Sequence, residues 1–67
     1  MGHRIEYFRG GKIIGARVSD APLEDTKKTA AGEMAPFGAD FVRLIDLDGS
    51  HAEVWSEKRT FPSDQAS

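Results

Sequence analysis

Residues 4–20 read RIEYFRGGKIIGARVSD, with two adjacent glycines near the middle. Apolar and polar side chains alternate on both sides of Gly10-Gly11, with the period of a half-buried strand. A two-residue turn between strands needs positive φ at both central positions, and glycine adopts that conformation without a steric penalty. The stretch therefore predicts a β-hairpin made of His3 to Arg9 and Lys12 to Val18.

The glycine turn also predicts which side chains share a face of this hairpin. In the regular register Phe8 pairs with Ile13, and every further step along one strand is matched by a step along the other. The first face then carries Ile5, Tyr7, Ile14, Ala16 and Val18. The reverse face carries Arg4, Glu6, Phe8, Ile13, Gly15 and Arg17.

A helix is predicted from Asp20-Ala21-Pro22 to about Ala35. The Asp20 side chain can accept a hydrogen bond from a first-turn amide, and proline near the first helical position loses no internal bond. Pro36 biases its preceding residue away from helical angles, so the helix is expected to end there. The apolar stripe of the helix comprises Leu23, Ala30 and Met34, with Phe37 as a candidate fourth member and Thr26 or Lys27 at its second step.

A second hairpin is predicted from residues 41–47 and 52–60. A two-residue loop at Asp48-Gly49 would place Leu44 opposite Glu53 and mix charged with apolar side chains on both faces. A three-residue loop over 47–49, with Gly49 in the left-handed conformation, separates them and is preferred. The face that joins Ile5 and Tyr7 then carries Val42, Leu44, Ala52 and Val54, and the reverse face carries Phe41, Arg43, Ile45, Glu53 and Trp55.

Together these elements predict an α+β domain of order β-β-α-β-β, with two hairpins in a four-stranded antiparallel sheet and one helix on one face. The order of the hairpins in the sheet stays open. Residues 1–61 are expected to form this single domain, and the polar segment 62–67 to be a disordered tail. No apolar run is long enough for a membrane span or for the hydrophobic centre of a secretory signal, so the chain is expected to be cytoplasmic.

The stretch LIDLDGSHAEVW, residues 44–55, combines acidic residues, glycine and histidine as calcium loops and catalytic sites do. A calcium loop aligned on Gly49 has Leu44 at its first position and Trp55 at its last, where oxygen ligands are required. Ser50 and His51 are neighbours on a strand, so they point to opposite faces and cannot act together on one substrate. We therefore predict a chain that is not an enzyme, with no catalytic, cofactor-binding or metal-binding residue.

The sheet face without a helix is the predicted interaction surface. Large aromatics with interspersed arginines are typical of interface centres, so homodimerisation or binding of a protein partner is the preferred function. The alternative is single-stranded RNA, with rings stacked on bases and arginines on phosphates. The net charge of −2 does not favour nucleic acid or an anionic membrane. The predicted contact residues are Phe8, Ile13, Arg17, Phe41, Arg43, Ile45 and Trp55.

In its plan, RIEYFRGGKIIGARVSD followed by a short helix and LIDLDGSHAEVW resembles small single-domain bacterial proteins of unknown function. The likeness extends from Arg4 to about Trp55 and implies a stand-alone cytoplasmic domain. It transfers no functional residue.

Overall fold

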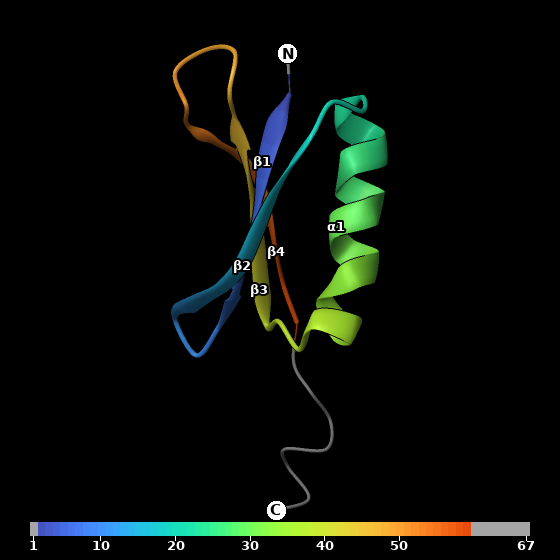
Figure 1. The fold of residues 1–67 in the computed structure, drawn as a ribbon, viewed down its shortest axis with the longest axis vertical. Helices are drawn as coiled ribbons and strands as arrows, with labels where there is room; N and C mark the ends of the chain where they lie inside the picture. Colours follow the sequence, from blue (N-terminus) through green and yellow to red (C-terminus); the bar gives the residue numbers. More distant parts are fainter. Residues whose placement is uncertain (1, 60–67) are drawn as a thin grey trace, which may run out of the picture.

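The fold, a computed structural model that describes residues 2–59, has four strands and one helix. The elements in chain order are β1 (His3–Arg9), β2 (Lys12–Ser19), α1 (Leu23–Phe37), β3 (Phe41–Asp46) and β4 (Glu53–Lys58) (Figure 1). The tail predicted at 62–67 lies outside the described residues.

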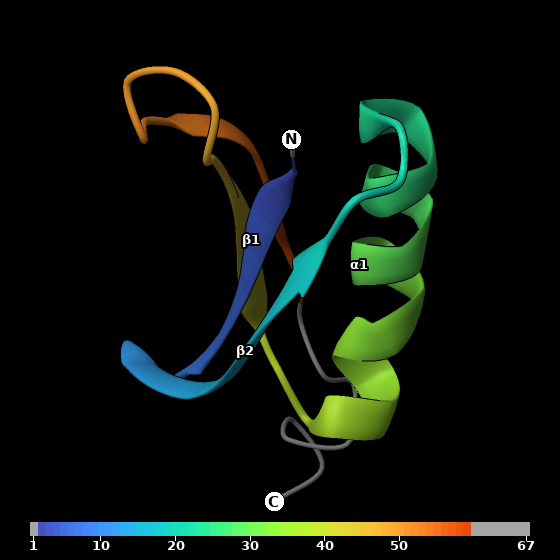
Figure 2. The ribbon, with the colours of Figure 1, turned by 45° about the horizontal axis from the view of Figure 1, so that its top comes forward.

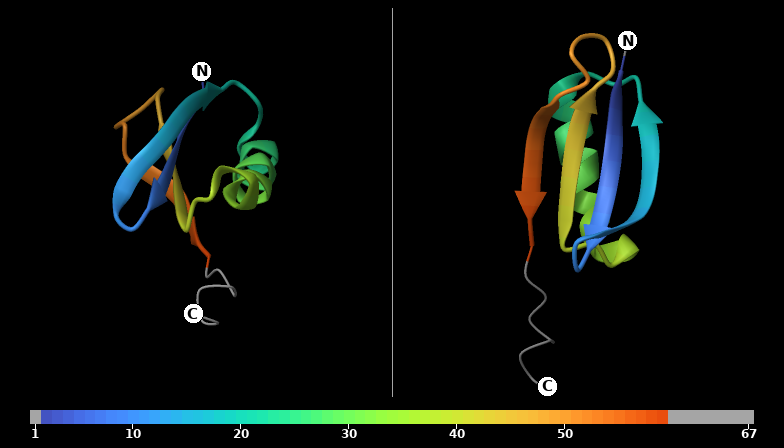
Figure 3. Two further views of the ribbon diagram at one scale, coloured as in Figure 1. Left: turned by 60° about the horizontal axis from the view of Figure 1, so that its bottom comes forward. Right: turned by 90° about the vertical axis from the view of Figure 1, so that its left-hand side faces the viewer.

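The strands form one antiparallel sheet in the order β2-β1-β3-β4, so the first strand of each hairpin lies at the centre. Helix α1 runs along one side of the sheet and leaves the other side uncovered (Figures 2 and 3). The predicted α+β class is confirmed, and the pairing of β1 with β3 settles the order of the hairpins.

The core lies between α1 and the two central strands. The four residues predicted to face the helix from these strands, Ile5, Tyr7, Val42 and Leu44, are fully buried. Helix α1 contributes Thr26, Ala30 and Met34, which confirms the predicted stripe with Thr26 at its second step. Ala39 completes this core, and Leu23 and Trp55 pack against it while partly exposed.

Both ends of α1 differ from the prediction. The N-terminal cap is Pro22 and no side chain caps the first turn, so the predicted role of Asp20 is wrong. The helix continues through Pro36 to Phe37, because the left-handed Gly38 closes it with two backbone bonds. The amide of Gly38 donates to the Ala35 carbonyl at 3.0 Å, and that of Ala39 to the Met34 carbonyl at 2.8 Å.

The first hairpin turns at Gly10-Gly11, both with positive φ, and pairs Phe8 with Ile13 as predicted. One step further the register shifts, because Tyr7 pairs with Gly15 and Ile14 becomes an extra residue on β2. This β-bulge reverses the facing of every later residue of the strand. The predicted placement of Ala16 and Val18 on the covered face is therefore wrong, because they pair with Glu6 and Arg4 and are exposed. Ile14 has no partner on β1 and is exposed as well.

The second hairpin repeats this arrangement. Ile45 pairs with Glu53 but Leu44 pairs with Trp55, so Val54 is the extra residue of a second bulge. The connection spans residues 47–52, and its left-handed residue is His51, with φ 58°, in place of the predicted Gly49. The predicted pairing of Leu44 with Ala52 and Val42 with Val54 is wrong for this reason.

Candidate interaction face

The candidate functional site is the side of the sheet that α1 does not cover, and we call it the open face. The register assigns to it Arg4, Glu6, Phe8, Ile13, Ala16, Val18, Phe41, Arg43, Ile45, Glu53, Ser56 and Lys58. Five of the seven predicted contact residues lie here: Phe8, Ile13, Phe41, Arg43 and Ile45. Ala16 and Val18 were not predicted, and only recognition of the first bulge would have found them.

Two rings and an arginine lie together where β1 and β3 meet. Phe8 and Phe41 are cross-strand partners, with ring centroids 5.7 Å apart in an edge-to-face arrangement. The guanidinium carbon of Arg43 lies 5.2 Å from the centroid of Phe8, within the range of a cation–π contact. Arg43 of the same chain therefore already covers a face of the Phe8 ring.

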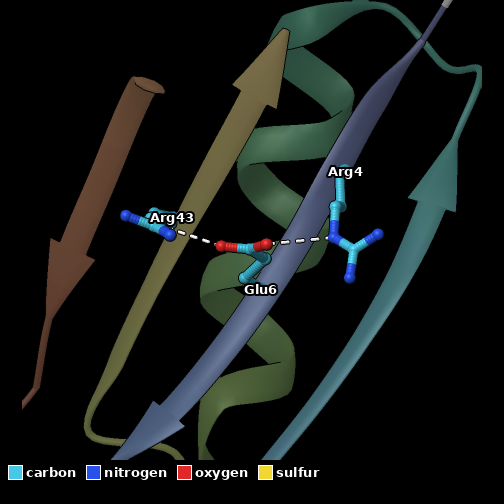
Figure 4. Close-up of polar contacts among 3 residues, drawn as sticks. All are labelled: Arg4, Glu6 and Arg43. Carbon is cyan, nitrogen blue, oxygen red and sulfur yellow. Dashed lines mark hydrogen bonds and ion pairs between the residues drawn. The ribbon is translucent and has the colours of Figure 1, made fainter. Parts of the chain in front are cut away.

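Glu6 holds two arginines of the open face (Figure 4). Arg43 Nε donates to one carboxylate oxygen at 2.6 Å and Arg4 Nε to the other at 2.9 Å. The Glu6 side chain is only 13% exposed, whereas the arginines are about half exposed. One carboxylate therefore offsets half of the positive charge of the pair and fixes both guanidinium groups.

Apolar exposure on the open face is concentrated at β2. Val18 is 61% and Ile13 51% exposed, whereas Phe8, Phe41 and Ile45 are partly buried by their neighbours. Ile13 and Val18 lie towards the two ends of β2 with Ala16 between them, and exposed apolar side chains along one strand of a small domain are typical of a contact surface. Covering the β2 side of this face would therefore remove the most apolar surface from water.

Two of the predicted contact residues lie on the covered face. Trp55 pairs with Leu44 and packs against the core, and Arg17 pairs with Ile5 and forms an ion pair with Glu33 of α1 at 3.2 Å. Their placement on the reverse face was wrong because each follows a bulge. The open face thus lacks the indole and one of its three predicted arginines.

Arg17 belongs to a polar cluster between the sheet and α1. The Tyr7 hydroxyl donates a 2.6 Å hydrogen bond to Glu33, whose carboxylate also meets Arg17. Burial of the phenol, with the bond to Glu33, raises the pKa of Tyr7 well above its usual value. A neutral, fully paired phenol is suited to holding the helix on the sheet, and it is no nucleophile.

The connection over residues 47–52 is held by its own polar groups. His51 Nε2 lies 3.1 Å from the Leu47 carbonyl oxygen, and the Asp48 amide donates to Asp46 at 3.0 Å. Among residues 2–59 no three His, Asp or Glu side chains are arranged to hold a metal ion.

A cavity of about 260 Å³ lies at the start of α1 and is lined by His3, Asp20 and Asp48 among others. Its two carboxylates make it unsuitable for an anion.

Comparison with known proteins adds no relative. No protein-family model, no curated protein and no solved structure matches this chain. Within residues 2–59, α1 is neither long nor apolar enough to cross a membrane.

Proposed function

We propose that this chain is a non-catalytic association module of the cytoplasm, which buries its open face against a protein surface, in the simplest case the same face of a second copy. The observation that carries the proposal is the exposure of Ile13 and Val18 on a sheet face that has no helix over it. No cofactor or metal enters the proposal. Removing these side chains from water is the driving force.

The polar groups of the open face favour protein over nucleic acid. Phosphate binding needs arginines free to neutralise it, but Arg4 and Arg43 share the carboxylate of Glu6. Base stacking needs an accessible ring face, and Arg43 lies over Phe8. Paired charges among apolar residues suit a protein partner, since they enter the interface already compensated.

The size of the open face sets the strength of the expected association. Strands about 4.8 Å apart and roughly six residues long, at about 3.3 Å per residue, give a face of roughly 20 by 20 Å. Two such faces bury on the order of 1,000 Å², which is below the roughly 1,600 Å² of a standard stable interface. We therefore expect a weak, reversible complex.

Sedimentation equilibrium from micromolar to millimolar protein tests the proposal. The apparent mass of the wild-type chain is expected to rise with concentration, and Ile45→Lys to weaken association by roughly tenfold or more by putting a charge into the interface. The new lysine lies between Glu53 on β4 and Arg4 on β1, so an attractive cross-strand pair offsets a repulsive one and the variant is expected to fold. Thr29→Lys, which adds the same charge on an exposed part of α1, is the matched control and is expected to have no effect.

A labelled single-stranded oligonucleotide provides the second arm of the test. Salt-sensitive binding by a chain that stays monomeric at millimolar concentration would replace the protein partner with nucleic acid. Equal association of the wild type and Ile45→Lys would show that the open face is not the contact surface.

A further inference from the structure

The unpaired edge of β2 is a second surface, distinct from the open face. β2 and β4 are the outer strands of the sheet, so each has a neighbouring strand on one side only (Figure 3, right). An edge strand presents a row of backbone donors and acceptors that another strand can pair with. The two edges of this sheet differ in how well they are protected.

Charged side chains protect β4 but hardly β2. Three of the six residues of β4 are charged, namely Glu53, Glu57 and Lys58. β2 has eight residues, of which only Lys12 and Arg17 are charged, and Arg17 is already paired with Glu33. In contrast, β2 carries three of the five exposed large apolar residues of the described chain, all β-branched: Ile13, Ile14 and Val18.

The sequence of β2 is complementary to itself. An antiparallel pair of β2 strands centred on Ala16 places Gly15 opposite the partner's Arg17, and Ile14 opposite the partner's Val18. No like charges face each other, and the two arginines lie diagonally across the small Gly15. Lys12 and Asp20 lie outside the paired segment and take no part in the contact.

We propose that two copies of this chain join through β2, antiparallel and around Ala16, to form one continuous eight-stranded sheet. A two-fold axis perpendicular to the sheet generates this arrangement and keeps both α1 helices on the same side. The end of the first hairpin curves away from α1 (Figure 2), and the bulge at Ile14 interrupts the regular ladder there, which limits pairing to residues 14–18 and keeps the contact weak. The open faces of the two copies then become one surface of twice the width.

Disulfide trapping tests this proposal, because the chain has no cysteine of its own. Directly opposite residues of an antiparallel pair have Cα atoms about 4.5–5.5 Å apart, within the range of a disulfide bond. Under mild oxidation Ala16→Cys is expected to give a cross-linked dimer roughly tenfold or more faster than Thr29→Cys, because pairing holds the two thiols together. Ala16 and Thr29 are both exposed, so thiol access is matched.

The same experiment in an Ile45→Lys background separates the two surfaces. Fast cross-linking that survives Ile45→Lys supports the β2 edge, whatever that change does to association through the open face. Cross-linking of Ala16→Cys no faster than that of Thr29→Cys overturns the β2 pairing and leaves the open-face proposal to its own test. Growth of the native chain into long assemblies, without cross-linking of the Ala16→Cys variant, also overturns it, since that outcome indicates head-to-tail pairing of β2 with β4.

Discussion

Trp55 lies opposite Leu44 on the neighbouring strand, and the indole therefore shares the face that α1 covers. Leu44 is fully buried, while Trp55 is only partly so because β4 is the outer strand on that side. The only tryptophan of the chain thus covers the edge of the core and does not belong to the open face.

Trp55→Ala is expected to lower the free energy of unfolding by about 2 kcal/mol, less than the roughly 3–5 kcal/mol of a fully buried tryptophan. Urea unfolding followed by circular dichroism measures the change. The neighbouring Val54→Ala removes an exposed bulge residue and is expected to cost less than about 1 kcal/mol. Equal losses for the two variants would contradict the placement of the indole against the core.

Tyr7 is expected to make the fold sensitive to alkali. Its pKa is raised in the folded chain, whereas the phenol of the unfolded chain ionises near pH 10, so above that pH the folded state holds more protons. The contribution of the neutral phenol to stability is complete below about pH 10 and falls above it by up to about 1.4 kcal/mol per pH unit.

Tyr7→Phe isolates this contribution, because phenylalanine has no hydroxyl to ionise and the variant therefore lacks this loss of stability above pH 10. Tyr7 is the only tyrosine, so tyrosinate absorbance reports on it alone, and ionisation is expected to coincide with loss of the circular dichroism signal. A phenol that ionised near pH 10 in a chain still folded would contradict the buried hydrogen bond to Glu33.

Glu6→Gln is expected to destabilise the fold by about 1–2 kcal/mol, since it leaves Arg4 and Arg43 beside each other without their shared carboxylate. Added salt is expected to reduce the loss, because it screens the two partly exposed guanidinium groups. The matched control is Glu24→Gln, which removes a carboxylate that is 79% exposed and paired with Lys27 on the helix surface. That change is expected to cost no more than about 0.5 kcal/mol. Thermal unfolding at two salt concentrations distinguishes the outcomes.

Two glycines of the helical region are expected to respond to alanine with opposite signs. Gly38 has φ 74°, so Gly38→Ala is strained and is expected to cost about 1 kcal/mol. A Cβ at Gly32, within α1, meets no atom within 4 Å apart from the local helix backbone, so Gly32→Ala is expected to stabilise by about 0.5–1 kcal/mol. Stabilisation by Gly38→Ala would contradict the left-handed cap.

The facing of side chains could be predicted from sequence throughout the central strands β1 and β3, but not throughout the outer strands β2 and β4. The regular alternation of Ile5 with Tyr7 and of Val42 with Leu44 is a pattern that β1 and β3 follow without interruption. The outer strands each contain one extra residue, Ile14 or Val54, and neither is the glycine or proline that usually indicates a break. From those positions onward a parity argument fails.

The candidate site could likewise be predicted from alternation only on the central strands. The facing of its residues on β1 and β3 was predicted correctly, because it depends only on alternation. Arg17 and Trp55 were assigned to the wrong face, because each lies beyond a bulge on an outer strand. The Glu6 carboxylate was missed as an organising group, since alternation says nothing about which charges meet.

The two extra residues give the fold an unusual freedom under insertion and deletion. Deleting Ile14 or Val54 would straighten the ladder while every other side chain kept its partner, so a shortened hairpin remains compatible with the same core. An added residue elsewhere in β2 would instead turn the rest of that strand over and carry Val18 toward the helix. In this small domain, inserting or deleting one residue in an outer strand can therefore exchange apolar and charged side chains between the two faces of the sheet without any substitution.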